Sequence, residues 1–384
     1  MKKVKLGDVC EIISGSTPKT EVKEYWGGEY KWITPAELSE NSYIVYDTAR
    51  HITKLGIQKT GLKPFPEGTV ILSSRAPIGK TAIAGCEMYC NQGFKNLICS
   101  DEINNIYLYF FLSSKTVYLN SLGRGATFKE LSKKIVENIE LCLPPIEIQI
   151  RIAERFEQIE KLLSIKNAEI MEINELVKSR FTEMFGEPFL NPKGWETAKI
   201  GDVVTDVRYG TSRPAIEGGM YPYLRMNNLT ADGHLDLTDL KYIDIPDNEI
   251  EKCIVRKGDV LFNRTNSVEL VGKTCVFDLD EEMVIAGYII RVRLNEKVLS
   301  EFLSAYMNSA ILKEHLRGMA KGAVNQANIN AQELQGIKIY LPPIELQQQF
   351  AEFVKQVEKA KSVIKDQLAE LETLKKSLMQ KYFR

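Results

Sequence analysis

The sequence predicts an α+β protein in which two tandem, mixed α/β domains are separated by a long antiparallel two-helix coiled coil. The first observation behind this prediction is an internal repeat, because Leu143-Pro144-Pro145-Ile146-Glu147 returns as Leu341-Pro342-Pro343-Ile344-Glu345, 198 residues further along the chain. The second is that each copy opens a long stretch with the apolar spacing of a coiled coil. The third is that the segments before the two copies share turn and strand motifs. Together these features predict an internal pseudo-two-fold repeat.

Each long stretch begins with two prolines, which suit a helix entry because their missing N–H would have no intrahelical partner there. Residues alternately four and three apart then follow, and this 3.5-residue period is typical of a coiled-coil seam. The first seam contains Ile152, Phe156, Ile159, Leu163, Lys166, Ile170, Ile173 and Val177. The second seam contains Phe350, Val354, Val357, Lys361, Ile364, Leu368, Leu371 and Lys375. Lysines interrupt both seams, and a polar seam residue lowers stability while it fixes register and partner.

The two seams most simply bury each other within one chain. About 35 residues at about 1.5 Å each predict a rod of roughly 50 Å. A generic coiled-coil dimerisation stalk would show the same pattern, so the rod alone leaves that alternative open.

Composition limits the classes of protein that the chain can represent. Its 384 residues suit two or three domains. With 50 basic and 51 acidic residues the formal charge is −1, which predicts no uniformly basic surface and leaves local patches to contact nucleic acid. Seven cysteines without a framework spacing, together with the lack of a signal peptide or a membrane-spanning apolar run, favour a cytoplasmic protein without a membrane partner.

The repeat extends into the globular regions. Gly7-Asp8-Val9 corresponds to Gly201-Asp202-Val203 near the start of each region. Glu67-Gly68-Thr69-Val70 corresponds to Lys257-Gly258-Asp259-Val260, and both predict a turn that leads into a buried strand. Helices are expected at 105–120 and 301–317, and final strands at 139–143 and 337–341. The predicted boundaries are a first domain at 1–142, a first long helix at 143–186, a second domain at 187–340 and a second long helix at 341–384.

No catalytic constellation is visible, and we predict no catalytic residue, no metal ligand and no cofactor. The segments 74–81 and 267–274 resemble a phosphate-binding P-loop, but serine replaces its first glycine and the residues that follow predict strands rather than the required helix. Asp8 with Glu21-Val22-Lys23 mimics a metal-dependent nuclease triad but has no counterpart in the second half. Cys86 and Cys90 lack a nearby histidine, which makes a zinc site there improbable. The histidines have no nucleophile motif beside them; they are His51, His234 and His315.

The chain resembles the specificity subunits of type I restriction–modification systems over nearly its whole length. The resemblance rests on the duplicated Leu-Pro-Pro-Ile-Glu helix entry, the Gly-Asp-Val starts, the two turn motifs above and Asn91-Gln92-Gly93-Phe94. The second half departs from the last motif, with Ala286-Gly287-Tyr288-Ile289 in its place, which puts the role of that loop in doubt.

This resemblance implies that the two globular regions are target-recognition domains, each reading one half of a split sequence in double-stranded DNA. It also implies that the helices act as a ruler and as a docking platform for two modification subunits, which carry adenine N6-methyltransferase chemistry. Restriction subunits would join them for cleavage. The chain itself would be a non-catalytic DNA-recognition subunit.

Candidate DNA contacts follow from side-chain chemistry, since arginine reads guanine, asparagine and glutamine read adenine, and lysine and arginine neutralise phosphates. In the first domain the candidates are Thr17, Lys31, Arg75, Lys80, Gln92, Lys95 and Lys129. In the second domain they are Arg208, Arg213, Arg225, Asn227, Asn228, Asn263, Arg264, Asn266 and Lys273. The competing interpretation for each residue is a local hydrogen bond at a turn or strand end. The tryptophans are expected in the core; they are Trp26, Trp32 and Trp195.

Two other functions compete with DNA recognition. A stand-alone methyltransferase or nuclease would need the catalytic motifs that are missing from the sequence. A coiled-coil adaptor that binds proteins would need none of them, but it would lack the steep salt dependence of a protein that contacts phosphates.

Overall fold

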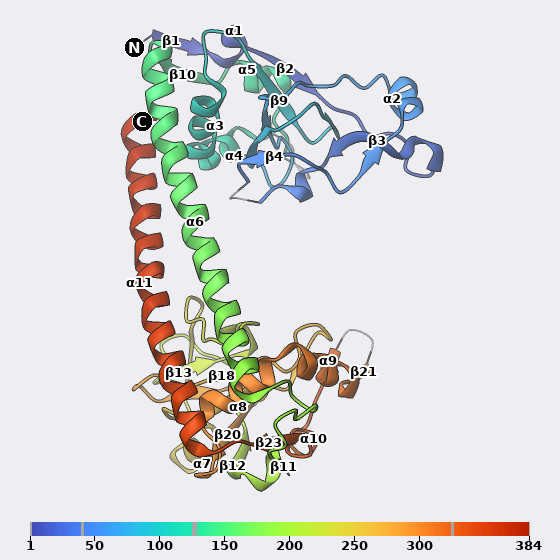
Figure 1. Cartoon of the computed structure of the whole chain (residues 1–384). Helices are drawn as coiled ribbons and strands as arrows, with labels where there is room; N and C mark the ends of the chain where they lie inside the picture. Colours follow the sequence, from blue (N-terminus) through green and yellow to red (C-terminus); the bar gives the residue numbers. More distant parts are fainter. Residues whose placement is uncertain (1, 40–41, 125–128, 324–325, 384) are drawn as a thin grey trace. The chain divides into compact units, whose positions relative to one another are not determined.

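The computed structural model describes residues 2–39, 42–124, 129–323 and 326–383. Internal contacts divide the chain into two compact units, the first formed by Met1–Lys166 with Asp366–Arg384 and the second by Asn167–Lys365. Each unit combines short strands with helices (Figure 1). The mixed α/β architecture predicted from the sequence is therefore confirmed.

The described part of the first unit contains a five-stranded sheet in the order β2-β9-β6-β7-β4 and a three-stranded sheet in the order β5-β3-β8. The strands of the larger sheet are β2 Cys10–Ser14, β4 Ile44–Val45, β6 Val70–Leu72, β7 Thr81–Ala84 and β9 Lys95–Cys99. Those of the smaller sheet are β3 Trp26–Ile33, β5 His51–Ile52 and β8 Tyr89–Cys90. A separate antiparallel pair joins β1 Lys2–Lys5 to β10 Glu140–Leu143. The shorter helices are α1 Leu6–Val9, α2 Lys54–Thr60, α3 Asn105–Ser114, α4 Thr116–Leu122 and α5 Lys133–Glu137, with 3₁₀ turns η1 Lys23–Tyr25 and η2 Pro35–Glu37.

The described part of the second unit repeats this plan with two four-stranded sheets, β12-β20-β16-β18 and β14-β13-β19-β15, and a three-stranded sheet β17-β22-β21. The first contains β12 Val204–Tyr209, β16 Val260–Asn263, β18 Thr274–Val276 and β20 Ile289–Leu294. The second contains β13 Tyr221–Leu224, β14 Lys241–Ile243, β15 Ile254–Val255 and β19 Met283–Ile285. The third contains β17 Thr265–Asn266, β21 Lys321–Ala323 and β22 Gln326–Asn328. The strand β11 Glu196–Lys199 pairs with β23 Lys338–Leu341. The shorter helices are α7 Asp247–Cys253, α8 Ser300–Asn308, α9 Ala310–Met319 and α10 Ala331–Gln335, with 3₁₀ turns η3 Ile200–Asp202 and η4 Met226–Asn228.

Several local predictions can be compared directly with these elements. The buried strands expected after the two glycine turns are confirmed, because β6 and β16 are buried along their whole length. The strands expected after the P-loop-like segments are confirmed as β7 and β18. Helices cover 301–317 as predicted, but they form two elements with a break at Ser309, whose hydroxyl accepts a hydrogen bond from the Leu312 N–H and so starts α9. The helix predicted at 105–120 likewise divides into α3 and α4 at Lys115.

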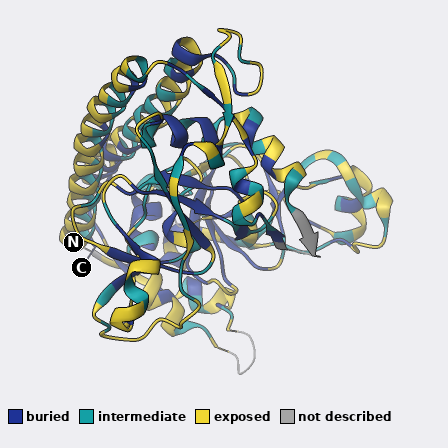
Figure 2. Ribbon diagram, turned by 90° about the horizontal axis from the view of Figure 1, so that it is seen from below, coloured by how far each residue is buried: buried dark blue, intermediate teal, exposed yellow. Residues whose placement is uncertain are grey.

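Two long helices follow the duplicated proline motifs. They are α6 Ile146–Phe185, with 40 residues, and α11 Ile344–Tyr382, with 39 residues. Every residue of the two predicted seams is buried or half-buried, whereas the intervening positions are largely exposed (Figure 2). In the first unit, Phe156 of α6 stacks on Phe383, just beyond the end of α11, with ring centroids 5.8 Å apart. In the second unit, Phe181 of α6 meets Phe350 of α11 edge to face, with centroids 5.6 Å apart.

A buried glutamine fixes the start of each long helix to its own unit. The Gln149 amide donates to the carbonyl oxygens of Glu102 and Pro144 at 3.0 and 2.8 Å, and its oxygen accepts from the Asn104 N–H at 2.9 Å. Gln347 repeats this geometry 198 residues later, and its amide donates to Lys297 and Pro342 at 3.0 and 2.9 Å while its oxygen accepts from Leu299 at 2.9 Å. Both glutamines have 0% exposure. The repeat therefore extends to individual hydrogen bonds.

Candidate nucleic-acid interface

In the first unit, several of the predicted DNA contacts lie on loops that meet one another. The loop after β2 is joined to the β8–β9 turn by a hydrogen bond from the Ser16 N–H to the Cys90 oxygen at 3.1 Å. Ser74, just after β6, donates its N–H to the Gly93 oxygen at 2.7 Å and accepts from the Leu131 N–H at 2.8 Å. Strand-end loops from four parts of the sequence thus form one surface.

Glycine is required where the first of these loops crosses the second. A Cβ built on Gly15 would lie 2.0 Å from the Cys90 carbonyl oxygen. Gly210, which follows β12 in the second unit, faces the same restriction, since its Cβ would lie 2.1 Å from the Ile285 oxygen. Distances under 3.0 Å to a backbone atom leave no room for any side chain. Gly15 and Gly210 thus position equivalent loops in the two units.

Two of the predicted contacts on this surface bond directly to each other. The hydroxyl of Thr17 donates to the side-chain oxygen of Gln92 at 2.5 Å, and Gln92 is exposed. The carbonyl end of Gln92 is therefore engaged, while its amide N–H groups have no protein partner among the described residues. An amide with free donors at an exposed turn can hydrogen-bond a base edge or a phosphate.

A carboxylate lies among the predicted basic contacts of the first unit. Glu130 accepts from Arg75 Nε at 3.0 Å and lies 3.4 Å from Lys95 Nζ. The Arg75 side chain remains 45% exposed, whereas that of Lys95 is only 7% exposed and also reaches Ser74 at 3.4 Å. Arg75 can therefore meet an external ligand without rearrangement, and Lys95 acts mainly within the protein.

The remaining lysines selected in the first unit differ in how far they are engaged. Lys31 donates to the Tyr46 carbonyl at 2.6 Å, and Lys80 donates to the Leu38 carbonyl. Both of these side chains are half-buried, and each carbonyl partner belongs to a loop beside the sheet. Lys129 is exposed and is free to approach phosphate.

The asparagine-rich segments of the second unit are used largely for internal hydrogen bonds. Asn228 is 2% exposed; its oxygen accepts from the Arg225 N–H at 2.8 Å and its amide donates to the Asp236 carbonyl at 2.8 Å. Asn263 is fully buried and donates to the Tyr288 carbonyl at 3.1 Å, while its oxygen accepts from Asn266 at 2.8 Å.

Asn227 differs from these residues. It is exposed, and its side chain makes no hydrogen bond among the described residues. Of the asparagines selected from the sequence, it is the one most available to an external ligand.

Ion pairs engage three of the four arginines selected in the second unit. Arg208 contacts Asp206 at 2.8 Å, Arg225 contacts Asp239 at 2.7 Å, and Arg213 grips Glu249 with two bonds of 2.8 and 3.1 Å. The hydrogen bond from Arg213 holds the pKa of the Glu249 carboxyl below its usual value, and the bond from Arg225 does the same for Asp239. These carboxylates stay ionised at neutral pH, so they reduce the positive field that each arginine presents.

Arg264 takes a different environment from the other three. Its guanidinium carbon lies 4.8 Å from the centre of the Tyr209 ring, and Nη1 donates to the Gly287 carbonyl at 3.3 Å. None of the described ion pairs involves it. An arginine stacked on a ring keeps its in-plane donors in a fixed orientation.

The P-loop-like segments 74–81 and 267–274 each contain a lysine with the same structural role. Lys273 follows the Gly272 turn, is 8% exposed and donates to the Met226 carbonyl at 2.7 Å. Lys80 donates to the Leu38 carbonyl in the same way. Burial lowers the pKa of Lys273 below the ordinary lysine value. In both units this lysine joins the hairpin between two strands to a 3₁₀ turn, which accounts for the motif without a nucleotide phosphate.

The tryptophans only partly follow the prediction that they lie in the core. Trp32 is 2% exposed, as expected. Trp26 and Trp195 are half-buried and pack at the edges of their clusters. Sequence reasoning also missed the positioning role of Gln149 and Gln347, although their equal distance from the proline motifs carried the signal.

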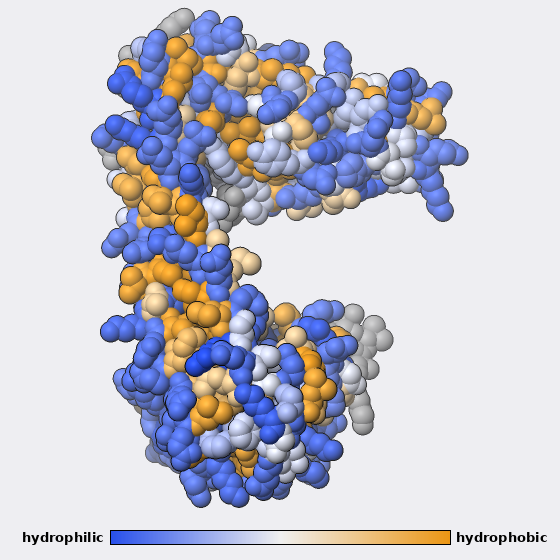
Figure 3. Space-filling model, viewed as in Figure 1, coloured by the Kyte–Doolittle hydropathy of each residue, from blue (hydrophilic) through white to orange (hydrophobic). Residues whose placement is uncertain are grey.

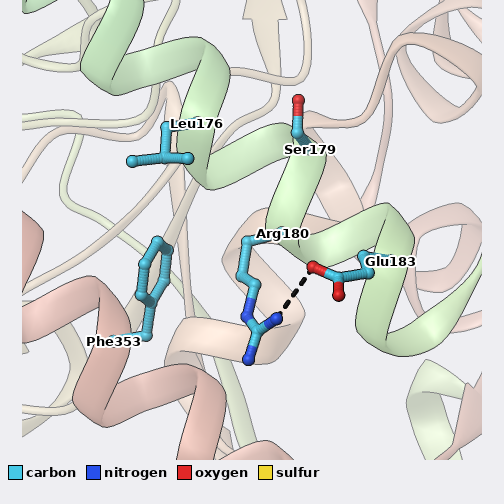
Figure 4. Close-up of a pocket in the computed structure, with 5 residues that line it drawn as sticks. All are labelled: Leu176, Ser179, Arg180, Glu183 and Phe353. Atoms are coloured by element: carbon cyan, nitrogen blue, oxygen red, sulfur yellow. Dashed lines mark hydrogen bonds and ion pairs between the residues drawn. The ribbon is translucent and has the colours of Figure 1, made fainter.

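A groove of about 560 Å³ lies on the long helices, and a larger one of about 700 Å³ in the first unit is lined by Arg124, Glu130, Ser132, Lys134, Ile135 and Asn138. The groove on the helices is the less polar of the two. Leu176, Ser179, Arg180 and Glu183 of α6 line it together with Phe353 of α11 (Figure 4). It is open and shallow, and its polar groups are occupied by the Arg180–Glu183 ion pair at 2.8 Å. Such a groove has no reactive group and suits contact with an apolar surface.

Among the residues that the structure describes, no cluster of histidine, cysteine, aspartate and glutamate could hold a metal ion. None of the described helices has the length and apolarity needed to cross a membrane.

Comparison with known proteins identifies the family. The family model for the type I restriction modification DNA specificity domain matches residues 1–175 and 192–373, one match for each half of the repeat. The chain belongs to this family. Its members are specificity subunits, which are non-catalytic recognition subunits of type I restriction–modification systems.

Curated relatives agree with this assignment. The specificity subunit of the MjaIX type I restriction enzyme from Methanocaldococcus jannaschii is 36% identical over 263 residues, which cover 62% of this chain and 60% of the relative. A second specificity subunit from that organism, MjaX, is 30% identical with 46% of its length covered, so these two relatives are matched over less than two thirds of their lengths. The EcoKI specificity subunit of Escherichia coli is 24% identical over 410 residues, covering 98% of this chain and 87% of that one.

Solved structures show the same fold. A structure titled for the assembly and conformational transition of the type I restriction–modification system matches with a TM-score of 0.59 and 20% identity, covering 100% of this chain and 97% of that one. The S subunit from M. genitalium matches with a TM-score of 0.56 and 15% identity, covering 100% and 96%.

Proposed function

We propose that this specificity subunit binds double-stranded DNA at a bipartite target, with each globular region reading one half-site. The observation that carries this proposal is the duplication of the loop surface. Each unit has a glycine crossing after its first long strand, a lysine that joins a hairpin to a 3₁₀ turn, and exposed polar side chains beside them. A repeated surface of this kind suits the reading of two separate short sequences by one chain.

Eight residues of the predicted set supply the DNA contacts in this proposal. In the first domain these are the exposed Arg75, Gln92 and Lys129 with the half-buried Thr17, and in the second they are the exposed Arg208, Arg213 and Asn227 with the half-buried Arg264. The more enclosed residues act by holding the loops in place; they are Lys31, Lys80, Lys95, Arg225, Asn228, Asn263, Asn266 and Lys273. No cofactor is needed for either task.

The long helices are proposed to form an antiparallel coiled coil with pseudo-two-fold symmetry. Four contacts support the antiparallel direction, because residues further along α6 contact partners that come earlier in the segment formed by α11 and Phe383. They join Phe156 to Phe383, Glu160 to Lys375, Asn174 to Lys361, and Phe181 to Phe350. In this arrangement the helices 143–186 and 341–384 separate a first target-recognition domain, 1–142, from a second, 187–340, and set the spacer of the split target.

The outer faces of the helices are proposed to dock two modification subunits, with restriction subunits joining the complex. Apolar side chains are exposed on the two long helices and include Leu162, Ile165, Met171, Leu176, Val363 and Leu374. Figure 3 shows hydrophobic surface on these helices. Contiguous exposed apolar surface marks a site where a protein partner binds. The complex would act in the cytoplasm, where its DNA is accessible.

The test is to map N6-methyladenine across a genome. This chain is co-expressed with its modification subunit in an unmethylated host, and a host with the modification subunit alone is the control. A split motif that appears only with the chain supports the proposal and defines the spacer. Active modification subunit and folded chain without any chain-dependent motif would contradict it, and would favour the coiled-coil adaptor instead.

A further inference from the structure

An arginine that was not selected from the sequence is held in a fixed orientation on the first unit. Arg50 precedes β5 and is exposed, and its guanidinium carbon lies 3.6 Å from the centre of the Trp26 ring and 5.4 Å from that of Trp32. The two indoles pack edge to face with centroids 4.9 Å apart. The Arg50 carbonyl accepts hydrogen bonds from the Trp32 N–H at 3.1 Å and from Thr48 Oγ1 at 2.8 Å. Both the backbone and the side chain of Arg50 are therefore restrained.

The aromatic platform beneath Arg50 is continuous with the candidate interface. Trp26 donates its indole N–H to the Lys19 carbonyl at 3.2 Å, and Trp32 donates to the Ser16 carbonyl at 3.2 Å. These carbonyls flank Thr17, whose hydroxyl bonds to Gln92. The loop that carries the predicted contacts thus rests on the same two indoles as the arginine.

Arg50 also differs from most of the arginines selected from the sequence in having no carboxylate partner. Arg75, Arg213 and Arg225 each form an ion pair within 3.0 Å. None of the ion pairs or side-chain hydrogen bonds found among the described residues involves the Arg50 guanidinium. A guanidinium carries five N–H donors in its plane, and stacking covers only its face. Arg50 therefore presents an uncompensated charge and an unoccupied row of donors.

The second unit contains a comparable stack. Arg264 lies over Tyr209 and likewise has no carboxylate partner among the described residues, although one of its donors is used by Gly287. Cation–π stacking desolvates one face of the arginine and limits its rotation. When a ligand binds such a restrained side chain, the side chain loses less conformational entropy than a mobile one would.

We propose that Arg50 contacts the DNA target of the first domain, where its donors bind a pair of adjacent acceptors. Such pairs occur on the guanine edge in the major groove and on the phosphate. This inference rests on the proposed function and adds a residue to its first half-site. Trp26 and Trp32 position the arginine and do not themselves touch the DNA.

The experiment uses the complex of this chain with its modification subunit and a duplex that contains the mapped target. Binding is measured for the wild type, for Arg50→Gln and Arg50→Lys, and for Lys133→Gln, which removes one exposed positive charge from α5 in the same unit. Each protein is titrated at several salt concentrations, on the target and on duplexes altered at each G·C pair of the first half-site. Thermal melting checks that each variant is folded.

We expect R50Q to bind the target about tenfold or more weakly and K133Q to bind like the wild type. If Arg50 reads guanine, R50Q also loses discrimination at one G·C pair. If it binds phosphate, R50Q weakens binding to all duplexes alike, and the slope of log K against log salt falls by about one. Either pattern supports the proposal.

Unchanged affinity, salt slope and discrimination in folded R50Q overturns the inference. If R50Q fails to fold, the R50K variant serves as the test, because lysine keeps the positive charge but lacks the planar row of donors. Binding by R50K equal to that of the wild type overturns the inference about Arg50, and binding at least threefold weaker supports it. A wild-type complex without sequence-selective binding would overturn the proposed function as well. If the wild type binds its target selectively and R50Q binds equally well, only the inference about Arg50 fails and the proposed function stands.

Discussion

Replacing Gln149 by leucine tests how each long helix is attached to its unit. The substitution keeps the side-chain volume nearly constant, so it creates no large cavity and isolates the polar contribution. It removes three hydrogen bonds, and it leaves the Asn104 N–H and the carbonyls of Glu102 and Pro144 without that partner. The effect should therefore come from unsatisfied backbone groups rather than from packing.

The magnitude follows from the number and burial of these groups. Each net hydrogen bond contributes about 1 kcal/mol, and a buried group left unpaired costs about 1–3 kcal/mol. The bond to Pro144 is fully buried, while those to Asn104 and Glu102 are partly so, which allows water to compensate two of the three groups. We expect Gln149→Leu to lower the free energy of unfolding of the first unit by about 3 kcal/mol.

Urea unfolding followed by circular dichroism measures this loss, with an expected decrease in the midpoint of the first unit's transition of about 1 M. Gln158→Leu is the matched control, since Gln158 is exposed on the same helix. Gln347→Leu should produce a similar loss in the second unit. A Gln149→Leu midpoint within experimental error of the Gln158→Leu midpoint would refute the reasoning.

Three further predictions concern recognition, spacing and pH. Asn263→Ala should lower the thermal midpoint because it removes buried hydrogen bonds, whereas Asn227→Ala should leave stability unchanged and weaken target discrimination; equal melting of the two variants would contradict this assignment. Inserting one heptad into both long helices should lengthen the spacer between the half-sites by about three base pairs and leave both half-sites intact. This follows from a helix rise of about 1.5 Å per residue and about 3.4 Å per base step. Altered half-sites in the methylome would contradict the proposal that the helices set the spacer. Burial lowers the pKa of His234 below 6.5, so the unfolded chain binds a proton at this residue at a higher pH than the folded chain does. The second unit should therefore lose stability as the pH falls below about 6.5. If a His234→Gln variant shows the same pH dependence of the urea midpoint as the wild type, His234 is not the cause.

Much of the architecture could be predicted from the sequence because the repeat fixed it twice. The strands after the glycine turns and before the proline motifs were found from local patterns, and both copies agreed. The breaks at Lys115 and Ser309 were missed because apolar residues continue on both sides of them. At Ser309 the hydroxyl satisfies the first amides of a new helix, and a serine beside an apolar run is too common to signal this by itself.

The sequence does not separate candidate DNA contacts from structural residues, because the same type of side chain can bind DNA or form hydrogen bonds within the protein. Asn227 and Asn228 are neighbours of identical chemistry, yet one is exposed and the other is 2% exposed. The spacing from Arg225 to Asn228 is that of a capping box, which could have assigned Asn228 to the turn. Arg50 was overlooked because its value depends on Trp26, 24 positions earlier in the sequence. Which of these residues touch DNA stays a prediction until binding is measured.

The lysines in the helix seams were located correctly from the sequence, but only part of their role was predicted. They were interpreted as residues that fix register, and Lys375 fits this reading through its 2.7 Å ion pair with Glu160 on the other helix.

Lys361 has a further role, because it reaches beyond the helices to a loop of the second unit. Its side chain is 2% exposed and lies 2.7 Å from both Asn174 Oδ1 and His234 Nε2. The charged groups that surround this contact are Asp232, Glu358 and Lys365. Burial lowers the pKa values of both Lys361 and His234, so an added proton on His234 would face an enclosed lysine. The seam lysine therefore joins the two long helices to the loop that carries His234, so a substitution of Lys361 should lower the stability of the second unit.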